Sequence, residues 1–167
     1  HLGDRATQWD ARALAWTYHG ILAAVVLACA VGTHARNKTY ASVEIMWRDV
    51  VKARPDNHRQ HISLVHALLA SKQVDEAESQ ARDLLGRLER ELSIGGTRAS
   101  LVQRAQYYHA AAGNALGCIL MVRGRYAEAS GVFKQVAEST PNPLYNCNLA
   151  MAMHKAGRTD EATALCE

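Results

Sequence analysis

Three short segments of the chain resemble one another, and each lies between two stretches in which apolar residues recur at helical spacing. They are residues 72–77 (KQVDEA), 124–129 (GRYAEA) and 157–162 (GRTDEA). In each copy a turn residue precedes acidic residues, which are favourable at the positive end of a helix dipole, and an alanine then lets a second helix approach closely. The pattern therefore predicts three helical hairpins, each made of a helix, a tight turn and a second helix.

The spacing of these copies is close to that of a known repeat. Ala129 and Ala162 are 33 residues apart, whereas Ala77 precedes Ala129 by 52 residues, which is one period plus an insertion of roughly 18. A period of about 34 residues resembles that of the tetratricopeptide repeat (TPR). The resemblance implies an all-α fold, a TPR-like α-α solenoid of antiparallel helical hairpins.

Other positions fit the TPR pattern, and some depart from it. The matching residues are Leu116-Gly117 and Leu149-Ala150 in first helices, Tyr126 and Phe133 in a second helix, and Pro55 and Pro141 after second helices. An earlier half-repeat ends at Pro55, with Val43 in place of the alanine and with packing positions at Tyr40, Trp47 and Val50. The departures are His61, Val65, Ala81 and Gly113. We therefore expect the repeats to occupy residues 36–167 and to be incomplete at the C-terminus.

The composition agrees with an all-helical fold. The 167 residues are 49% hydrophobic and only 6% aromatic, with too few strand formers at period two for a sheet. The insertion lies between Gly86 and Gln103, where Gly95-Gly96 interrupts the helical spacing and Thr97 is placed to cap a new helix. We expect longer helical arms there. They are either a surface for a partner or an insertion that a solenoid tolerates.

The N-terminal part of the chain has a different pattern. Residues 13–35 contain no Asp, Glu, Lys or Arg, and residues 20–32 (GILAAVVLACAVG) are apolar throughout. Trp16 on one flank and Arg36 on the other are typical of a transmembrane helix, which needs about 20 apolar residues. We therefore predict that residues 1–35 are a membrane-proximal and transmembrane segment. The alternative is a soluble helix that caps the repeats, because an apolar run of about 10 to 14 residues also suits a buried helix.

The junction between the two parts carries a second resemblance. It comprises residues 35–42 (ARNKTYAS), 46–51 (MWRDVV) and 54–57 (RPDN). These segments resemble the connection between the last membrane helix and the first repeat in the transmembrane-and-TPR O-mannosyltransferase-like glycosyltransferases. The resemblance implies a catalytic part before His1, so that the chain is a piece of a longer enzyme. The side of the membrane stays open, because basic residues before and after the span nearly balance.

No pattern in the chain predicts a catalytic, metal or cofactor site. His58, His61 and His66 share a predicted helix without a recognised ligand spacing; His61 is expected to fill a packing position and the other two to be solvated. The cysteines form no CxxC pair, so we expect free and mostly buried thiols, with Cys29 in the membrane segment and Cys118, Cys147 and Cys166 on separate repeat helices. The acidic pairs that begin helices are explained by the helix dipole. We therefore predict no enzyme, cofactor or metal in this segment.

Recognition by the concave face of the repeats remains as the function. The net charge is +3 with bases scattered among acids, which argues against a nucleic-acid partner. The TPR resemblance places first helices on the inner surface, where Met and Cys adapt to apolar side chains and Asn bonds to a peptide backbone. The candidate groove residues are Arg59, Ile62, His66, Leu69, Asn114, Cys118, Met121, Leu144, Cys147, Asn148 and Met151.

The sequence thus predicts a non-catalytic TPR scaffold that binds a protein or peptide ligand and is tethered to a membrane through residues 13–35. The repeat domain would lie in an aqueous compartment on an undetermined side. Two alternatives stay open. One is the C-terminal TPR tail of a polytopic glycosyltransferase, and the other is a soluble assembly scaffold.

Overall fold

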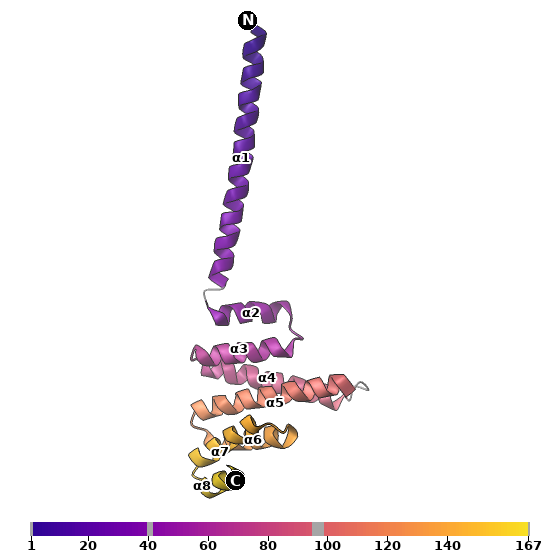
Figure 1. The fold of residues 1–167 in the computed structure, drawn as a ribbon, viewed down its shortest axis with the longest axis vertical. Coiled ribbons are helices and arrows are strands. Elements are labelled where there is room, and N and C mark those ends of the chain that lie inside the picture. The colour runs from indigo at the N-terminus through magenta and orange to yellow at the C-terminus, as the bar shows by residue number, and fades with distance from the viewer. Residues whose placement is uncertain (1, 40–41, 95–98, 167) are drawn as a thin grey trace. The chain divides into compact units, whose positions relative to one another are not determined.

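The computed structural model describes residues 2–39, 42–94 and 99–166, and every regular element within them is an α helix (Figure 1). The all-α prediction is confirmed for this part of the chain. The break at Gly95-Gly96, the cap Thr97 and the packing position of Tyr40 lie outside the described residues. The helices are α1 (Leu2–Thr39), α2 (Val43–Ala53), α3 (His58–Ala70), α4 (Val74–Ser93), α5 (Ala99–Val122), α6 (Tyr126–Ser139), α7 (Pro143–Lys155) and α8 (Thr159–Cys166).

The chain divides into two compact units, residues 1–46 and 47–167. The first unit is dominated by α1, in which the segment Ala13–Asn37 has a mean hydropathy of 1.9 and is not buried. This segment is long and apolar enough to cross a membrane. Two of its polar side chains bond to the helix itself: the Thr17 hydroxyl donates to the Leu14 carbonyl at 2.7 Å, and Nδ1 of His19 lies 2.6 Å from the Ala15 carbonyl. Such bonds lower the cost of placing these groups among lipid chains.

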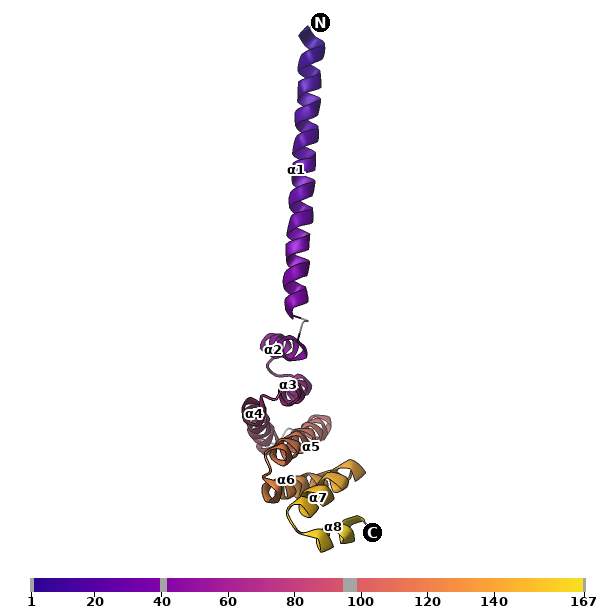
Figure 2. The same cartoon turned by 90° about the vertical axis from the view of Figure 1, so that its left-hand side faces the viewer.

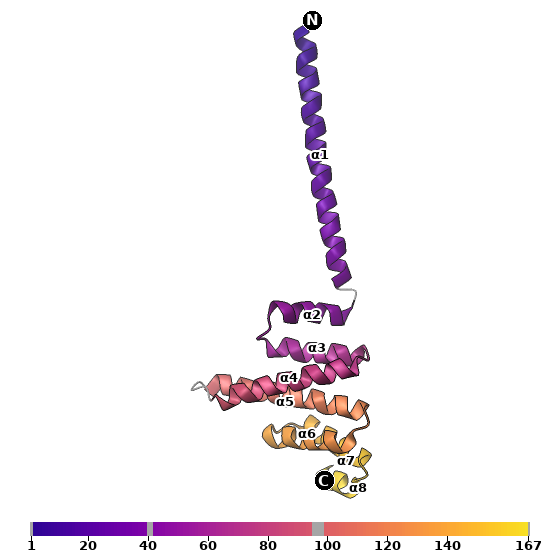
Figure 3. The same ribbon diagram turned by 180° about the vertical axis from the view of Figure 1, so that it is seen from behind.

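In the second unit, α3 with α4, α5 with α6 and α7 with α8 form hairpins that are closed by the same turn (Figures 2 and 3). The central residue of each turn has a positive φ, which is +63° at Lys72, +74° at Gly124 and +83° at Gly157. The next N–H donates to the carbonyl five positions earlier, as from Arg125 to Leu120 at 2.9 Å. This is the Schellman arrangement, which satisfies the last carbonyls of a helix. The three predicted hairpin turns are therefore present.

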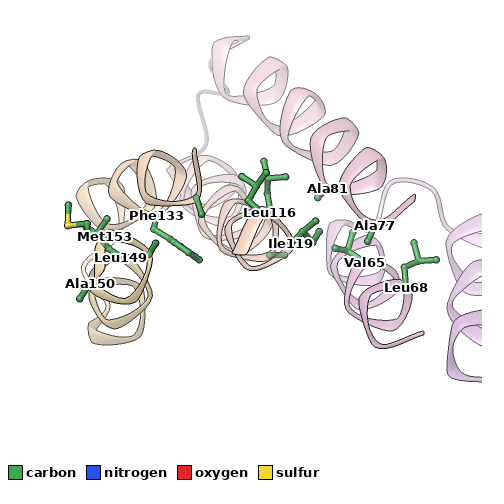
Figure 4. Close-up of a cluster of buried hydrophobic side chains, with 14 of the residues drawn as sticks. Val65, Leu68, Ala77, Ala81, Leu116, Ile119, Phe133, Leu149, Ala150 and Met153 are labelled. Carbon is green, nitrogen blue, oxygen red and sulfur yellow. The ribbon is translucent and has the colours of Figure 1, made fainter. Parts of the chain in front are cut away.

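Small residues at the helix contacts let the hairpins pack closely (Figure 4). The repeated alanines Ala77, Ala129 and Ala162 are buried. A Cβ atom on Gly117 would lie 2.5 Å from the Phe133 ring, and one on Gly113 would lie 2.6 Å from Cγ2 of Val136. Gly113, which departs from the TPR pattern, thus has a packing reason. The main core continues through all three hairpins.

The predicted longer arms are α4 and α5, with 20 and 24 residues against 13 in α3 and 14 in α6. A second cluster of buried side chains joins these arms. Its members are Leu84, Leu88, Ala105 and Ala112, with Leu92 and Tyr108 packed against them. The additional length is therefore folded onto the unit by apolar contact.

Candidate partner-binding surface

The candidate surface is built from the first helices of the hairpins, α3, α5 and α7. Besides its own second helix, α3 contacts α5. A hydrogen bond from Nδ2 of Asn148 to Oδ1 of Asn114, 2.7 Å long, joins α7 to α5. The eleven predicted residues therefore lie on three successive first helices that are linked directly to one another.

The structure separates the eleven residues into two groups. The exposed side chains are those of Arg59, His66, Leu144, Cys147 and Met151. The half-buried ones are those of Ile62, Leu69, Asn114, Cys118, Met121 and Asn148. Four of the half-buried side chains also pack against the two apolar clusters, and these are Ile62, Leu69, Cys118 and Met121. Part of the predicted groove is therefore packed against the core, and the exposed side chains of the first group remain accessible to a ligand.

The open apolar side chains are concentrated on α7. Leu144 and Met151 keep 56% and 54% of their surface exposed, and Cys147 between them is exposed as well. Because these residues are separated by three and four positions, they share one face of the helix. The opposite face of α7 is buried through Tyr145 and Leu149. The helix therefore has one packed face and one apolar face that stays free.

The two asparagines bond to each other and also keep polar groups for a ligand. They are 34 residues apart in the chain, and the bond uses one N–H of Asn148 and one lone pair of Asn114. The Asn114 amide still has its two N–H donors, and the Asn148 carbonyl oxygen can still accept. A donor and an acceptor thus lie side by side between α5 and α7.

The cysteine prediction is confirmed in part. Cys29, Cys118 and Cys147 are free thiols, but Cys147 is exposed, so the expected burial is wrong there. Cys29 lies in the unburied apolar segment of α1. The side chain of Cys166 lies outside the described residues. Burial raises the pKa of the Cys118 thiol. Cys147 is therefore the more accessible thiol of the two in the repeats.

The histidines of α3 have separate surroundings. His58 was expected to be solvated, but Nε2 lies 3.0 Å from a Glu91 carboxylate oxygen and the side chain is only 15% exposed. His61 is buried as predicted, with Nε2 at 2.8 Å from the Pro55 carbonyl, and burial is the main cause of its lowered pKa. His66 is exposed. Within the described residues, no three His, Cys, Asp or Glu side chains group closely enough to hold a metal ion.

An ion-pair network that the sequence analysis missed joins the first two hairpins. Glu78 of α4, whose side chain is 11% exposed, pairs with Arg82 at 2.8 Å and with Arg123 and Arg125 of the next turn at 2.9 Å each. Glu128 pairs with Arg82 at 2.8 Å. Hydrogen bonds from Arg82 hold the pKa of both carboxyls below the ordinary value, and the charges of neighbouring arginines add to this. Both acids stay ionised and hold the hairpins in register.

Part of this network follows a rule that the sequence does contain. Val43 and each repeat alanine except Ala162 are followed five positions later by a basic residue. This basic residue lies near the acid that directly precedes the next repeat alanine. The pairs are Arg48 with Glu76 at 2.6 Å, Arg82 with Glu128 at 2.8 Å, and Lys134 with Glu161. In the third pair the pKa of Glu161 is lowered by the hydrogen bond from Arg158 and further by the charge of Lys134. The acids that start the second helices therefore have a role beyond the helix dipole.

Two hollows on the described surface are lined by residues other than the candidates. One lies between α3, α4 and α5 and is lined by His58, Glu91 and Leu101 among others. Another lies between α4, α5 and α6, beside Gly86 and Gln135. The candidate surface is therefore an open face, which suits an elongated ligand better than a small enclosed one.

Searches of protein-family models, curated proteins and solved structures found no match to this chain. The class of the protein is therefore given by its own fold. It is an all-helical chain in which a long apolar helix precedes a stack of helical hairpins.

Proposed function

We propose that residues 36–167 are a TPR-like solenoid that binds a protein or peptide segment and is not itself catalytic. The shared turns, the buried repeat alanines and the 33-residue spacing of Ala129 and Ala162 support the repeat class. Stacked hairpins of this kind leave an extended face along their first helices. That face is where binding is proposed.

The observation that carries the proposal is the free apolar face of α7 beside the asparagine pair. Leu144, Cys147 and Met151 offer apolar surface, while Asn114 and Asn148 offer a donor and an acceptor. An extended peptide presents apolar side chains together with unpaired backbone N–H and C=O groups. The surface therefore matches both parts of such a ligand, and the methionine and cysteine can adapt to its shape.

The experiment selects binders from a phage-displayed library of random peptides, with the full chain held in detergent micelles. Peptides selected in this way should lose binding by about tenfold or more with Met151→Glu, because a charge would then replace an apolar contact. The matched control is Ile94→Glu at the end of α4, where the side chain is 82% exposed and apolar but lies away from the proposed face. Binding that both variants leave unchanged would refute the proposed surface.

We also propose that residues 13–35 tether the repeats to a membrane. The full chain should float with phosphatidylcholine vesicles after an alkaline wash. Val26→Arg should weaken this association, because an arginine near the centre of a span costs about 2.5 to 3.5 kcal/mol. Ala13→Arg is the control, since an arginine at the end of a span can reach the interface. A chain that is soluble without detergent and does not float would favour the soluble scaffold.

The alternative of a glycosyltransferase tail rests on the junction sequence alone. It concerns residues beyond the 167 of this chain. The complete reading frame tests it, because such an enzyme would carry several further hydrophobic spans before His1.

A further inference from the structure

Acidic and basic side chains are distributed unequally between the two kinds of helix in the hairpins. The first helices α3, α5 and α7 contain no Asp or Glu, whereas each of the second helices α4, α6 and α8 contains at least two. The charged side chains of the first helices are all basic, and they are Arg59, Arg104 and Lys155. The proposed binding face therefore has a positive charge that the second helices do not share.

Within the described part of the chain, these cations have no acidic partner. The arginines around Glu78 and Glu128 each pair with a carboxylate. By contrast, none of the described carboxylates forms an ion pair with Arg59, Arg104 or Lys155. The acids Asp75, Glu76 and Glu128, which lie close to the first two turns, pair with Arg123, Arg48 and Arg82 instead. The charge of the first helices is consequently available to a ligand.

Two of the cations lie on the outer first helices of the proposed face, Lys155 on α7 and Arg59 on α3. Lys155 follows Met151 by four residues and so continues the stripe that starts at Leu144. Arg59 lies near the start of α3, with the exposed His66 two turns further along the same side. Because the first helices of successive hairpins run in the same direction, Arg59 and Lys155 lie toward opposite ends of the face.

The separation of these two cations sets the length of a matching ligand. Counted from the repeat alanine of its own hairpin, Lys155 lies eleven positions further along the first helix than Arg59 does. Eleven positions are about 16 Å along a helix axis. Two steps between helix axes, at about 8 to 10 Å each, add a similar distance across the face. The diagonal of about 25 Å equals roughly seven or eight residues of extended chain.

We infer that the surface of α3, α5 and α7 binds an extended acidic peptide, with apolar side chains over α7 and carboxylates near Arg59 and Lys155. The asparagine pair would bond to the backbone of the peptide between these points. This inference rests on the proposed binding function and specifies the chemistry of its ligand. Uncharged Leu144, Cys147 and Met151 supply the contact area, and the cations select the sign of the flanking charges.

The test repeats the random-peptide selection at low salt with a charge-reversal variant, Arg59→Glu with Lys155→Glu. Peptides selected by the unaltered chain should be enriched in Asp and Glu and should bind this variant about tenfold more weakly. The variant should itself select basic peptides. The matched control is Lys52→Glu with Arg90→Glu, which makes the same change in net charge on α2 and α4 and should leave binding unchanged.

Three results would overturn the inference, and they can be told apart. Peptides without charge bias that still lose binding with Met151→Glu would remove the acidic ligand and leave the proposed function in place. Failure to select any peptide would remove both. Equally tight binding of oligothymidylate would show a general surface for polyanions. Arg59→Gln with Lys155→Gln should give an intermediate loss, and circular dichroism should show that each variant keeps its helices.

Discussion

Gly117→Ala should destabilise the repeat unit, although alanine is the better helix former. Propensity alone would favour alanine in the middle of α5 by about 1 kcal/mol. A Cβ atom at this position, however, would lie 2.5 to 2.8 Å from three atoms of the Phe133 ring. That ring is only 1% exposed and cannot turn out to solvent. Because overpacking of a closed core costs about 1 to 3 kcal/mol, and this contact is severe, we expect a net loss of about 2 kcal/mol.

The assay is urea unfolding of the full chain in mild detergent, followed by far-ultraviolet circular dichroism. The matched control is Gly131→Ala in α6, where an added Cβ meets no atom within 4 Å. This control should gain about 0.5 to 1 kcal/mol. In a double-mutant cycle, Phe133→Leu should relieve the effect of Gly117→Ala, with a coupling of about 1 kcal/mol or more.

The comparison of the two glycines decides the result. If Gly117→Ala were as stable as the unaltered chain, or more stable in the way expected of Gly131→Ala, α5 and α6 would not approach as closely as the structure shows. If the destabilisation occurred without coupling to Phe133, the ring would not be its cause.

Three further predictions concern the turns and the ion pairs. Lys72→Gly should raise the free energy of unfolding by about 1 kcal/mol, because Lys72 has a φ of +63°, and Gly124→Ala should lower it by a similar amount; urea midpoints measure both. The pKa of Glu78 is lowered from 4.5, so its contribution to the free energy of unfolding should be complete above about pH 4.5. This contribution should disappear as the pH falls through the lowered pKa. Glu78→Gln should therefore flatten this part of a stability–pH profile. Arg48→Glu and Glu76→Arg should each cost up to about 1 kcal/mol, and the double exchange should recover most of it in a thermal unfolding series.

Local features of the fold could be predicted from the sequence. The turns at Lys72, Gly124 and Gly157 could be located from a few neighbouring residues. In each, the residue with positive φ is followed within a few positions by at least one acidic residue in the first turn of the next helix. The longer arms also follow from local periodicity. The free thiols could be predicted, but the exposure of Cys147 could not, since the free face of α7 depends on which side of that helix meets its neighbours.

Contacts between hairpins could not be predicted in the same way. The bond between Asn114 and Asn148 requires two helices that are 34 residues apart to pack side by side. The pairing of His58 with Glu91 likewise depends on the fold of the long arms, and therefore the expectation of a solvated His58 was wrong. A repeat alignment does bring such positions together, as the spacing of Arg82 and Glu128 around the repeat alanines shows. Contacts between hairpins could therefore be predicted from an alignment of the repeats, but not from the pattern of any single helix.

This distribution of contacts separates stability from binding. Carboxylates such as Glu78 and Glu128 at the second helices are held by arginines, so that charge changes there act on the register of the hairpins. The first helices are packed by small and apolar residues and lack acids, so the unpaired charges of Arg59 and Lys155 cost little to remove. Reversing those two charges should therefore alter a ligand preference while leaving the urea midpoint nearly unchanged. Changing Glu78 should do the opposite, because its three arginines would each lose one of their carboxylate partners, the one that is most buried.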